Sequence, residues 1–138
     1  MNRDKEEVRG ADIVGSPKSN ASGPGPEVMA ASTLEGNDVY NSQGEKLGSI
    51  DEIMLDVLNG RIAYGVLSRG GVLGIGDKLY AIPWGALTLD TDRECFVLDV
   101  SADRLKEDPG FDKDHWPSMA DDAWARRTYA YYGQDPYW

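Results

Sequence analysis

The residues that could do chemistry in this chain are few, and their spacing matches no familiar catalytic signature. His115 is the only histidine and Cys95 the only cysteine among the 138 residues. Catalysis by such a group needs a second residue beside it that activates or orients it. No serine, cysteine or acid near His115 in the sequence forms a recognisable arrangement of this kind. We therefore expect a solvent-facing loop histidine, no catalytic residues and no enzymatic activity.

Metal binding has little more support in the sequence. A single histidine and a single cysteine leave only carboxylates as further ligands. The acidic segments Asp51–Glu52 and Asp90–Asp92 have neither the length nor the glycine position of a calcium-binding loop. We predict solvated acidic turns at both places and no metal site.

The glycine-dense segment 65–84 is the stretch that most suggests a cofactor. Its glycines resemble those of a phosphate-binding loop, but no Gly-Lys-Ser/Thr follows them. In a GxGxxG pattern starting at Gly74, Leu79 stands where the third glycine is needed. Apolar runs flank the glycines, and glycine permits positive φ and close backbone approach at a barrel corner. We predict a tight hairpin at Gly70 and Gly71 and no cofactor.

The overall charge limits the kinds of partner that the chain can bind. Its net charge is −10 and its isoelectric point is near 4.4, so nonspecific attraction to nucleic acid or to an anionic membrane is not expected. No segment has the length of a transmembrane span, and charges of both signs stand at residues 1–7 without an apolar export signal behind them. With Cys95 unable to form an intrachain disulfide and placed in an apolar run, we expect a buried thiol and a cytoplasmic location.

Composition divides the chain into three parts. Residues 1–33 are rich in Gly, Pro, Ser and Asn and poor in large apolar side chains, which is typical of a disordered segment. Residues 34–100 contain short apolar runs separated by turn signals, and residues 101–138 contain helix signals and many aromatic residues. We predict one β domain between a disordered N-terminal segment and a C-terminal extension with short helices.

The middle part predicts five or six short strands. The step from Ile50 to Ile53 breaks strict alternation, which indicates a β-bulge around Asp51 and Glu52. Asn59-Gly60 between two apolar runs is a strong hairpin signal. The expected strands are 38–40, 46–57, 61–66, 79–82 and 94–100, with a short strand or bend at 85–89. Such a series forms a small barrel or sandwich.

The last quarter of the chain holds eight of its thirteen aromatic residues. Helical signals appear at residues 101–105 and again at 123–133, where Trp124, Thr128 and Tyr131 share one face. A short tail cannot bury so many aromatic rings within itself, so they either fold back onto the barrel or dock on another chain, and both can hold at once. We predict a candidate interaction surface made of Trp116, Trp124, Tyr129, Tyr131, Tyr132, Tyr137 and Trp138.

Three blocks in fixed order resemble the PRC-barrel family, which is named for the cytoplasmic domain of the photosynthetic reaction-centre H subunit. They are residues 44–50 (GEKLGSI), 56–66 (DVLNGRIAYGV) and 74–84 (GIGDKLYAIPW). The resemblance covers about residues 34–100 and implies a small, mostly antiparallel PRC-type β-barrel. Residues 111–138 look like the extension of stand-alone bacterial members. The chain lacks the membrane helix of the H subunit and the additional barrel of the ribosome-maturation factor, and the family offers no catalytic motif.

Together these observations favour a non-enzymatic adaptor that binds a protein partner or itself, with a homodimer as one form. Two alternatives follow by analogy with the family. One is an accessory factor in ribosome or RNA metabolism that acts through protein contacts, because the charge argues against direct binding of nucleic acid. The other is a regulator of an electron-transfer or membrane complex.

Overall fold

The chain folds around a single mixed β-sheet. The computed structural model describes residues 10–15, 27–70 and 77–138. In these residues seven strands form one sheet in the order β1-β6-β7-β2-β3-β4-β5. The strands are β1 (Asp12–Val14), β2 (Asp38–Tyr40), β3 (Lys46–Asp56), β4 (Arg61–Arg69), β5 (Lys78–Pro83), β6 (Leu87–Asp90) and β7 (Cys95–Leu98). The prediction of a mainly β fold is confirmed.

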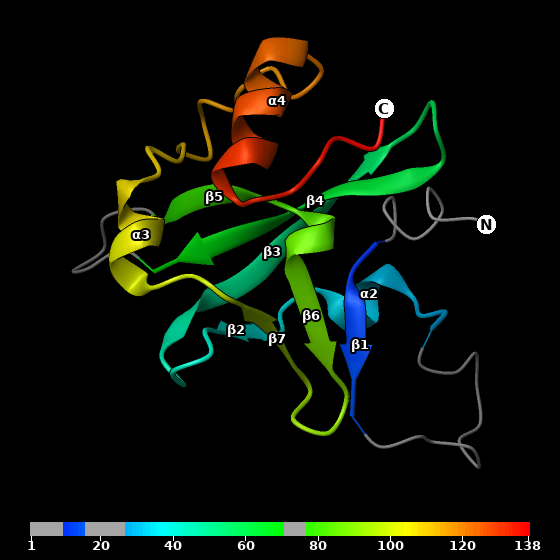
Figure 1. Cartoon of the computed structure of the whole chain (residues 1–138), viewed down its shortest axis with the longest axis vertical. Helices are drawn as coiled ribbons and strands as arrows, with labels where there is room; N and C mark the ends of the chain where they lie inside the picture. Colours follow the sequence, from blue (N-terminus) through cyan, green and yellow to red (C-terminus); the bar gives the residue numbers. More distant parts are fainter. Residues whose placement is uncertain (1–9, 16–26, 71–76) are drawn as a thin grey trace.

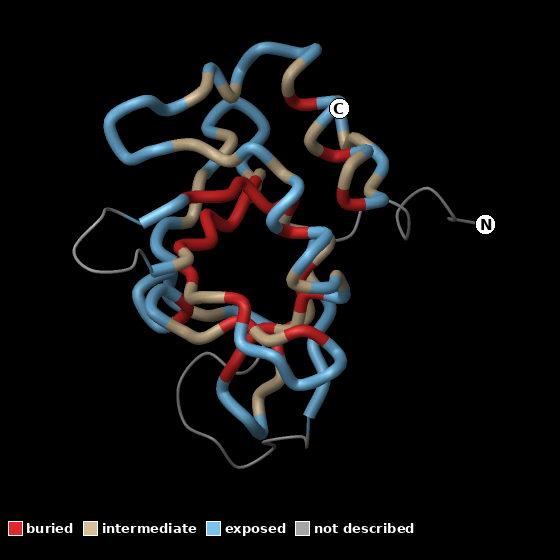
Figure 2. The backbone as a smooth tube through the Cα atoms, turned by 90° about the vertical axis from the view of Figure 1, so that its left-hand side faces the viewer, coloured by how far each residue is buried: buried red, intermediate tan, exposed pale blue. Residues whose placement is uncertain are grey.

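The sheet curls into a barrel-like ring that is not closed. Figure 2 shows this ring, in which the buried segments of the chain concentrate. The edge strands β1 and β5 do not pair with each other. The prediction of five or six antiparallel strands is wrong in two details, because the sheet has seven strands and two of its pairings, β1–β6 and β2–β7, are parallel. Alternating apolar residues indicate a strand but not the direction of the neighbour with which it pairs.

One of the added strands lies where disorder was predicted. Within residues 1–33, Asp12–Val14 form β1 and pair in parallel with residues 88–90 of β6 (Figure 1). All three residues of β1 are exposed, so backbone hydrogen bonds hold the strand more than apolar burial does. A hydrophobic pattern in the sequence indicates burial only, and it therefore did not predict this strand. The predicted disorder of residues 1–9 and 16–26 lies outside the described residues, and so does the hairpin predicted at Gly70 and Gly71, because the description omits residues 71–76.

The turn signals of the sequence place the long β3–β4 hairpin correctly. Ile50 pairs with Leu67 and Glu52 with Val66, so Asp51 is the extra residue of the predicted bulge. The hairpin turns at residues 57–60, where the Asn59 backbone N–H donates to the Asp56 carboxylate at 3.0 Å. A second register shift between Met54 and Leu55 was not predicted. The hairpin extends beyond the barrel, towards the C-terminal end of the chain (Figure 1).

Short helices flank the sheet. They are α2 (Ala31–Leu34), the 3-10 turn η1 (Trp84–Ala86), α3 (Ala102–Glu107) and α4 (Asp122–Tyr131). The Ser101 hydroxyl caps α3 and the Asp121 carboxylate caps α4, each by accepting a backbone N–H of the first turn. The predicted helical segments at 101–105 and 123–133 are therefore confirmed, whereas α2 was not predicted.

Strand β4 separates two apolar clusters. On one side Leu67 joins the main core of the barrel with Ile50, Ile82 and Phe96. On the other side Tyr64 packs in a second cluster with residues of β5 and α4. The sequence predicted one buried face for this strand, but both faces are covered because α4 lies across β4 and β5 (Figure 1). The C-terminal extension thus adds a second layer of core to the small barrel.

Candidate protein-interaction site

The aromatic residues of α4 pack on the barrel of their own chain. Tyr129 is only 4% exposed, and its ring contacts Tyr64 edge-on at 5.5 Å between centroids. Its hydroxyl donates to the Ala63 carbonyl at 2.9 Å, and burial raises its pKa to about 12. Trp124, which is half-buried, also packs against Tyr64, with 5.5 Å between the ring centroids. These two residues of the predicted surface are therefore part of the second cluster.

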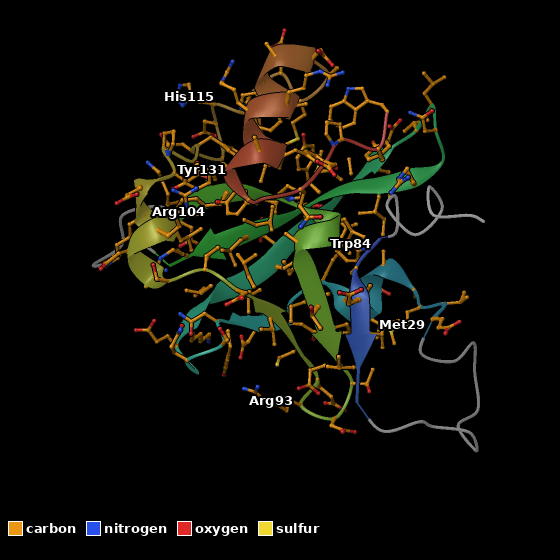
Figure 3. The ribbon with its side chains drawn as sticks, viewed as in Figure 1. Met29, Trp84, Arg93, Arg104, His115 and Tyr131 are labelled. Carbon is orange, nitrogen blue, oxygen red and sulfur yellow. The ribbon has the colours of Figure 1, made fainter. Side chains whose placement is uncertain are left out.

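The end of α4 is tied to α3 and to the segment that follows it. Tyr132 is buried and donates its hydroxyl to Asp108 at 2.5 Å. Tyr131 donates to the Arg104 carbonyl, and the Arg104 guanidinium lies 3.9 Å from the centroid of its ring. Figure 3 shows Arg104 of α3 beside Tyr131 of α4. These contacts fix the position of the extension on the barrel.

Trp116 has its ring contact with Phe111, which is not one of the predicted surface residues. It precedes α4 in the connecting segment, where its ring packs on Phe111 at 5.0 Å and remains partly exposed. The Phe111 backbone in turn forms a short bridge to Leu79 of β5, with a hydrogen bond of 2.9 Å from the Leu79 N–H. Trp116 therefore belongs to the connection between α3 and α4, not to a shared surface with the residues that follow α4.

Tyr137 and Trp138 fold back on the β3–β4 hairpin and on α4. The Tyr137 hydroxyl donates to the Asp56 carboxylate, and the Arg61 guanidinium lies over the ring of Tyr137 at 3.9 Å. The Trp138 indole donates to the Asp122 carboxylate at 2.8 Å and packs edge-on against Tyr129. The last residues of the chain are thus held by two carboxylates as well as by aromatic contacts.

Both carboxylates are stabilised in their charged form by these contacts. The hydrogen bond from Tyr137, with further bonds from Asn59, lowers the pKa of Asp56 to about 2. The hydrogen bond from Trp138, followed by that from Arg126, lowers the pKa of Asp122. Burial, with the Asp56 carboxylate beside it, raises the pKa of Tyr137. At neutral pH the two carboxylates are ionised and already accept internal hydrogen bonds.

An apolar groove lies between the β3–β4 hairpin, the start of α4 and the last residues of the chain. We call it the hairpin groove; its volume is about 480 Å³. Its lining residues are Met54, Leu55, Asp56, Val57, Leu58, Asn59, Ala63, Tyr64, Met119, Ala120, Asp122, Ala125, Tyr129, Tyr137 and Trp138. At the turn of the hairpin Val57 is 87% exposed and Leu58 is 92% exposed. The exposed apolar tip of the hairpin therefore forms one wall of the groove.

The hairpin side of this surface was missed in the sequence analysis. Leu55, Val57 and Leu58 were assigned to a strand and its turn, and were counted as barrel core or left unassigned. The signal that could have found them is the position of Val57 and Leu58 directly before Asn59-Gly60, because tight turns are usually polar. Of the predicted surface residues, Tyr129, Tyr137 and Trp138 line the hairpin groove.

A smaller pocket of about 290 Å³ lies on the other side of α4. Trp124, Thr128 and Tyr131 line it together, as the helical spacing predicted, and the segment Asp108–Phe111 forms its opposite wall. The lining of this pocket also includes one basic residue, Arg127. Trp124 and Tyr131 therefore line a different cavity from Tyr129, Tyr137 and Trp138.

The chemically active side chains lie away from both cavities. His115 is exposed on the loop before α4, 4.0 Å from Asp112, as expected from the sequence (Figure 3). Cys95 is buried in β7, and burial raises the pKa of its thiol. Within the described ranges, three or more potential metal ligands do not cluster anywhere. Among the same residues, the helices are too short or too polar to span a bilayer.

Comparisons with known proteins place the barrel in a family. No curated protein matches the chain. The solved structures that resemble it include RimM, a 16S ribosomal RNA processing protein from Pseudomonas aeruginosa, with 21% sequence identity and a TM-score of 0.39. That alignment covers 64% of this chain and 50% of the other, so the chain spans half the length of that protein, and a likeness of this degree carries no functional argument.

The family model of the PRC-barrel domain matches residues 26–105, which is more than half of the chain. The match contains α2, the strands β2 to β7 and most of α3, and it ends before the aromatic extension. The match and the curled sheet agree with the resemblance seen in the sequence blocks. The chain belongs to the PRC-barrel domain family.

Proposed function

We propose that this protein is a non-enzymatic interaction module in which the PRC barrel supports a protein-binding surface at the hairpin groove. The observation that carries the proposal is the exposure of Val57 and Leu58 in the lining of the apolar groove. Contiguous exposed apolar surface is rare on monomeric proteins and marks sites of association. The aromatic extension contributes one wall of the groove through Tyr129, Tyr137 and Trp138.

The arrangement of the groove favours binding over catalysis. The carboxylates in its lining, Asp56 and Asp122, have lowered pKa values and accept hydrogen bonds from neighbouring side chains. A general acid at neutral pH needs a raised carboxyl pKa instead. No described feature favours a role in RNA metabolism or in an electron-transfer complex over this more general role.

The proposal is tested by removing the apolar tip without disturbing the fold. The double variant Val57→Ser with Leu58→Ser changes two exposed side chains, so folding stability should change little. The matched control is Val28→Ser, which changes an apolar residue that is 66% exposed elsewhere on the chain. Tagged forms of the intact chain are used to capture proteins from a cell extract that also contains the untagged chain.

We expect the wild-type and Val28→Ser chains to recover the same specific proteins and the double variant to lose them. The recovered set can include the untagged chain itself. If the double variant recovers the same proteins in the same amounts as the wild type, the hairpin tip is not part of a binding surface and the proposal is wrong. Circular dichroism of all three chains confirms that the comparison is between folded proteins.

A further inference from the structure

The hairpin tip forms one wall of the hairpin groove, and the chemistry of this surface indicates what binds there. Building on the proposed function, we infer that the partner is a second copy of this chain, with the Val57–Leu58 tip of each copy seated in the hairpin groove of the other. The pair would be a symmetric dimer in which each copy supplies both a tip and a groove.

The first argument is that the surface is complementary to itself. A two-fold interface requires that one patch contain both members of each contact, because residue i meets residue j and residue j meets residue i. Val57 and Leu58 are largely exposed and form part of the lining of the groove, whose other lining residues include Ala63, Ala125 and Tyr129. An isolated tip or an isolated groove would need a different partner, whereas the two together satisfy the requirement of a symmetric pair.

The second argument comes from the charges at the groove. Its lining contains two acids and no lysine, arginine or histidine. Asp56 accepts from Tyr137 and Asn59, and Asp122 accepts from Trp138 and forms an ion pair of 2.8 Å with Arg126. A cationic partner would have to compete with these internal donors for each carboxylate. The groove is therefore better suited to an uncharged apolar segment, which is what Val57 and Leu58 provide.

The third argument is the adaptability of the groove walls. Met54 and Met119 lie in its lining, and both are partly buried members of the second apolar cluster. Unbranched thioether side chains can rearrange around an inserted residue at low cost. Trp138, which is 44% exposed, stands at the same surface and can be covered when the tip of the other copy enters. Aromatic residues of this kind commonly dominate association energy.

Sedimentation equilibrium of the full chain, carried out over a wide range of concentration, tests the stoichiometry. We expect a reversible dimer for the wild type and at least about tenfold weaker dimerisation for Leu58→Asp, because a carboxylate would be placed in an apolar groove. The matched control Val28→Asp adds the same charge at another exposed apolar site and should dimerise like the wild type. A wild-type chain that is monomeric throughout would overturn the inference, and so would equal effects of the two substitutions.

Cross-linking of mixed variants tests which surfaces meet. One chain carries Leu58→Cys and a second, distinguished by a mass tag, carries Ala120→Cys in the groove lining. A short bis-maleimide joins two thiols as thioethers, so a product of the two unlike chains can arise only between copies. The native Cys95 is buried and its thiol pKa is raised, which keeps its reaction slow. The control mixture replaces the first chain by Val28→Cys.

We expect the unlike product from Leu58→Cys with Ala120→Cys and little from the control mixture. Equal yields in the two mixtures would overturn the arrangement even if a dimer exists. A monomeric chain that captures a different protein through its hairpin tip would overturn the second copy as the partner while leaving the proposed interaction role standing. A chain that is monomeric and that captures no protein through its hairpin tip would refute both proposals.

Discussion

Tyr137 holds the last residues of the chain against the β3–β4 hairpin through one hydroxyl group and one ring face. The hydroxyl donates to Asp56, and the Arg61 guanidinium lies over the ring. Asp56 and Arg61 carry opposite charges on the same hairpin, and Tyr137 contacts both of them at the edge of the groove. Removing the Tyr137 hydroxyl should therefore change the pKa of Asp56.

We predict that Tyr137→Phe raises the pKa of Asp56 from about 2 towards its ordinary value of 3.8, because the largest cause of the shift is lost. A lowered folded-state pKa contributes stability above the unfolded pKa, and this stability is lost as the pH falls through the folded value. The wild type should therefore lose more stability than the variant between roughly pH 4 and pH 2. Carboxyl NMR titration and urea unfolding at several pH values measure both effects. An unchanged Asp56 titration would contradict the hydrogen bond.

Gly110 allows the chain to cross β5 closely before α4 begins. Its φ is +59°, and a Cβ at this position would lie 2.6 Å from the Leu79 carbonyl oxygen. We predict that Gly110→Ala destabilises the protein by about 1 to 3 kcal/mol through backbone strain and this contact. Gly133→Ala is the control, because φ is +71° there but a Cβ would meet no atom within 4 Å. Thermal unfolding should show the larger loss for Gly110→Ala, and equal losses would mean that the contact relaxes freely.

At the residue scale the sequence was informative wherever a local rule determines the outcome. The bulge at Asp51, the helical segments at 101–105 and 123–133, and the exposed His115 all follow from neighbouring residues alone. The bonds of Tyr137 and Trp138 could not be predicted, because their acceptors, Asp56 and Asp122, lie far away or on another element. The type of a side chain shows that it needs a hydrogen-bond partner, but it does not show which acceptor the fold brings near it.

At the scale of elements, Tyr129 is the largest buried side chain of α4, and it holds the helix in place together with the contacts of Trp124 and Tyr131. Tyr129 contacts Tyr64 of β4 and Trp138 beyond the helix, and it donates to the backbone of Ala63. Within the helix, Tyr129 and Ala125 are the two buried residues. The position of the helix therefore depends on how well the Tyr129 ring is packed.

We predict that Tyr129→Ala lowers the free energy of unfolding by about 3 to 5 kcal/mol, as other large-to-small aromatic changes in cores do. Tyr129→Phe keeps the ring and removes the hydroxyl, and it should cost about 1 kcal/mol. Urea unfolding of the full chain measures the two values. If both variants lose the same small amount, α4 is not held on β4 by this ring.

The sequence predicted the strands of the barrel better than their pairing. Periodicity and turn residues located β2 to β7, but the parallel contacts of β2 with β7 and of β1 with β6 depend on the whole curled sheet. The covering of Tyr64 was also beyond the sequence, because a bulky strand face looks the same whether barrel core or a helix buries it. For the same reason the hairpin groove, which lies between three elements, could not be foreseen.

At the scale of the whole molecule, the net charge of −10 opposes the meeting of two copies. The hairpin groove itself contains no unpaired cation to offset this repulsion, and both of its carboxylates are internally bonded. Long-range repulsion and local apolar attraction should therefore respond to salt in different ways. The first is screened, with a Debye length of about 10 Å at 0.1 M salt, whereas the second is not.

We predict that dimerisation becomes stronger as sodium chloride is raised from low to moderate concentration. Sedimentation velocity at a fixed protein concentration should show a growing dimer fraction, and Val28→Asp should show a slightly steeper response because it adds charge. A dimer that dissociates when salt is added would indicate an interface held by ion pairs, contrary to the lining of the groove.

The parallel pairing of β2 with β7 has a consequence for how the barrel is made. Val39 and its partner Phe96 are separated in the sequence by almost the entire domain, so their pairing closes a long loop of the chain. Folds dominated by such distant pairings have high contact order and fold slowly. During synthesis β2 must wait for β7 to leave the ribosome, and until then the nascent chain exposes an open strand edge. The barrel can reach its final form only when nearly all of it has been translated.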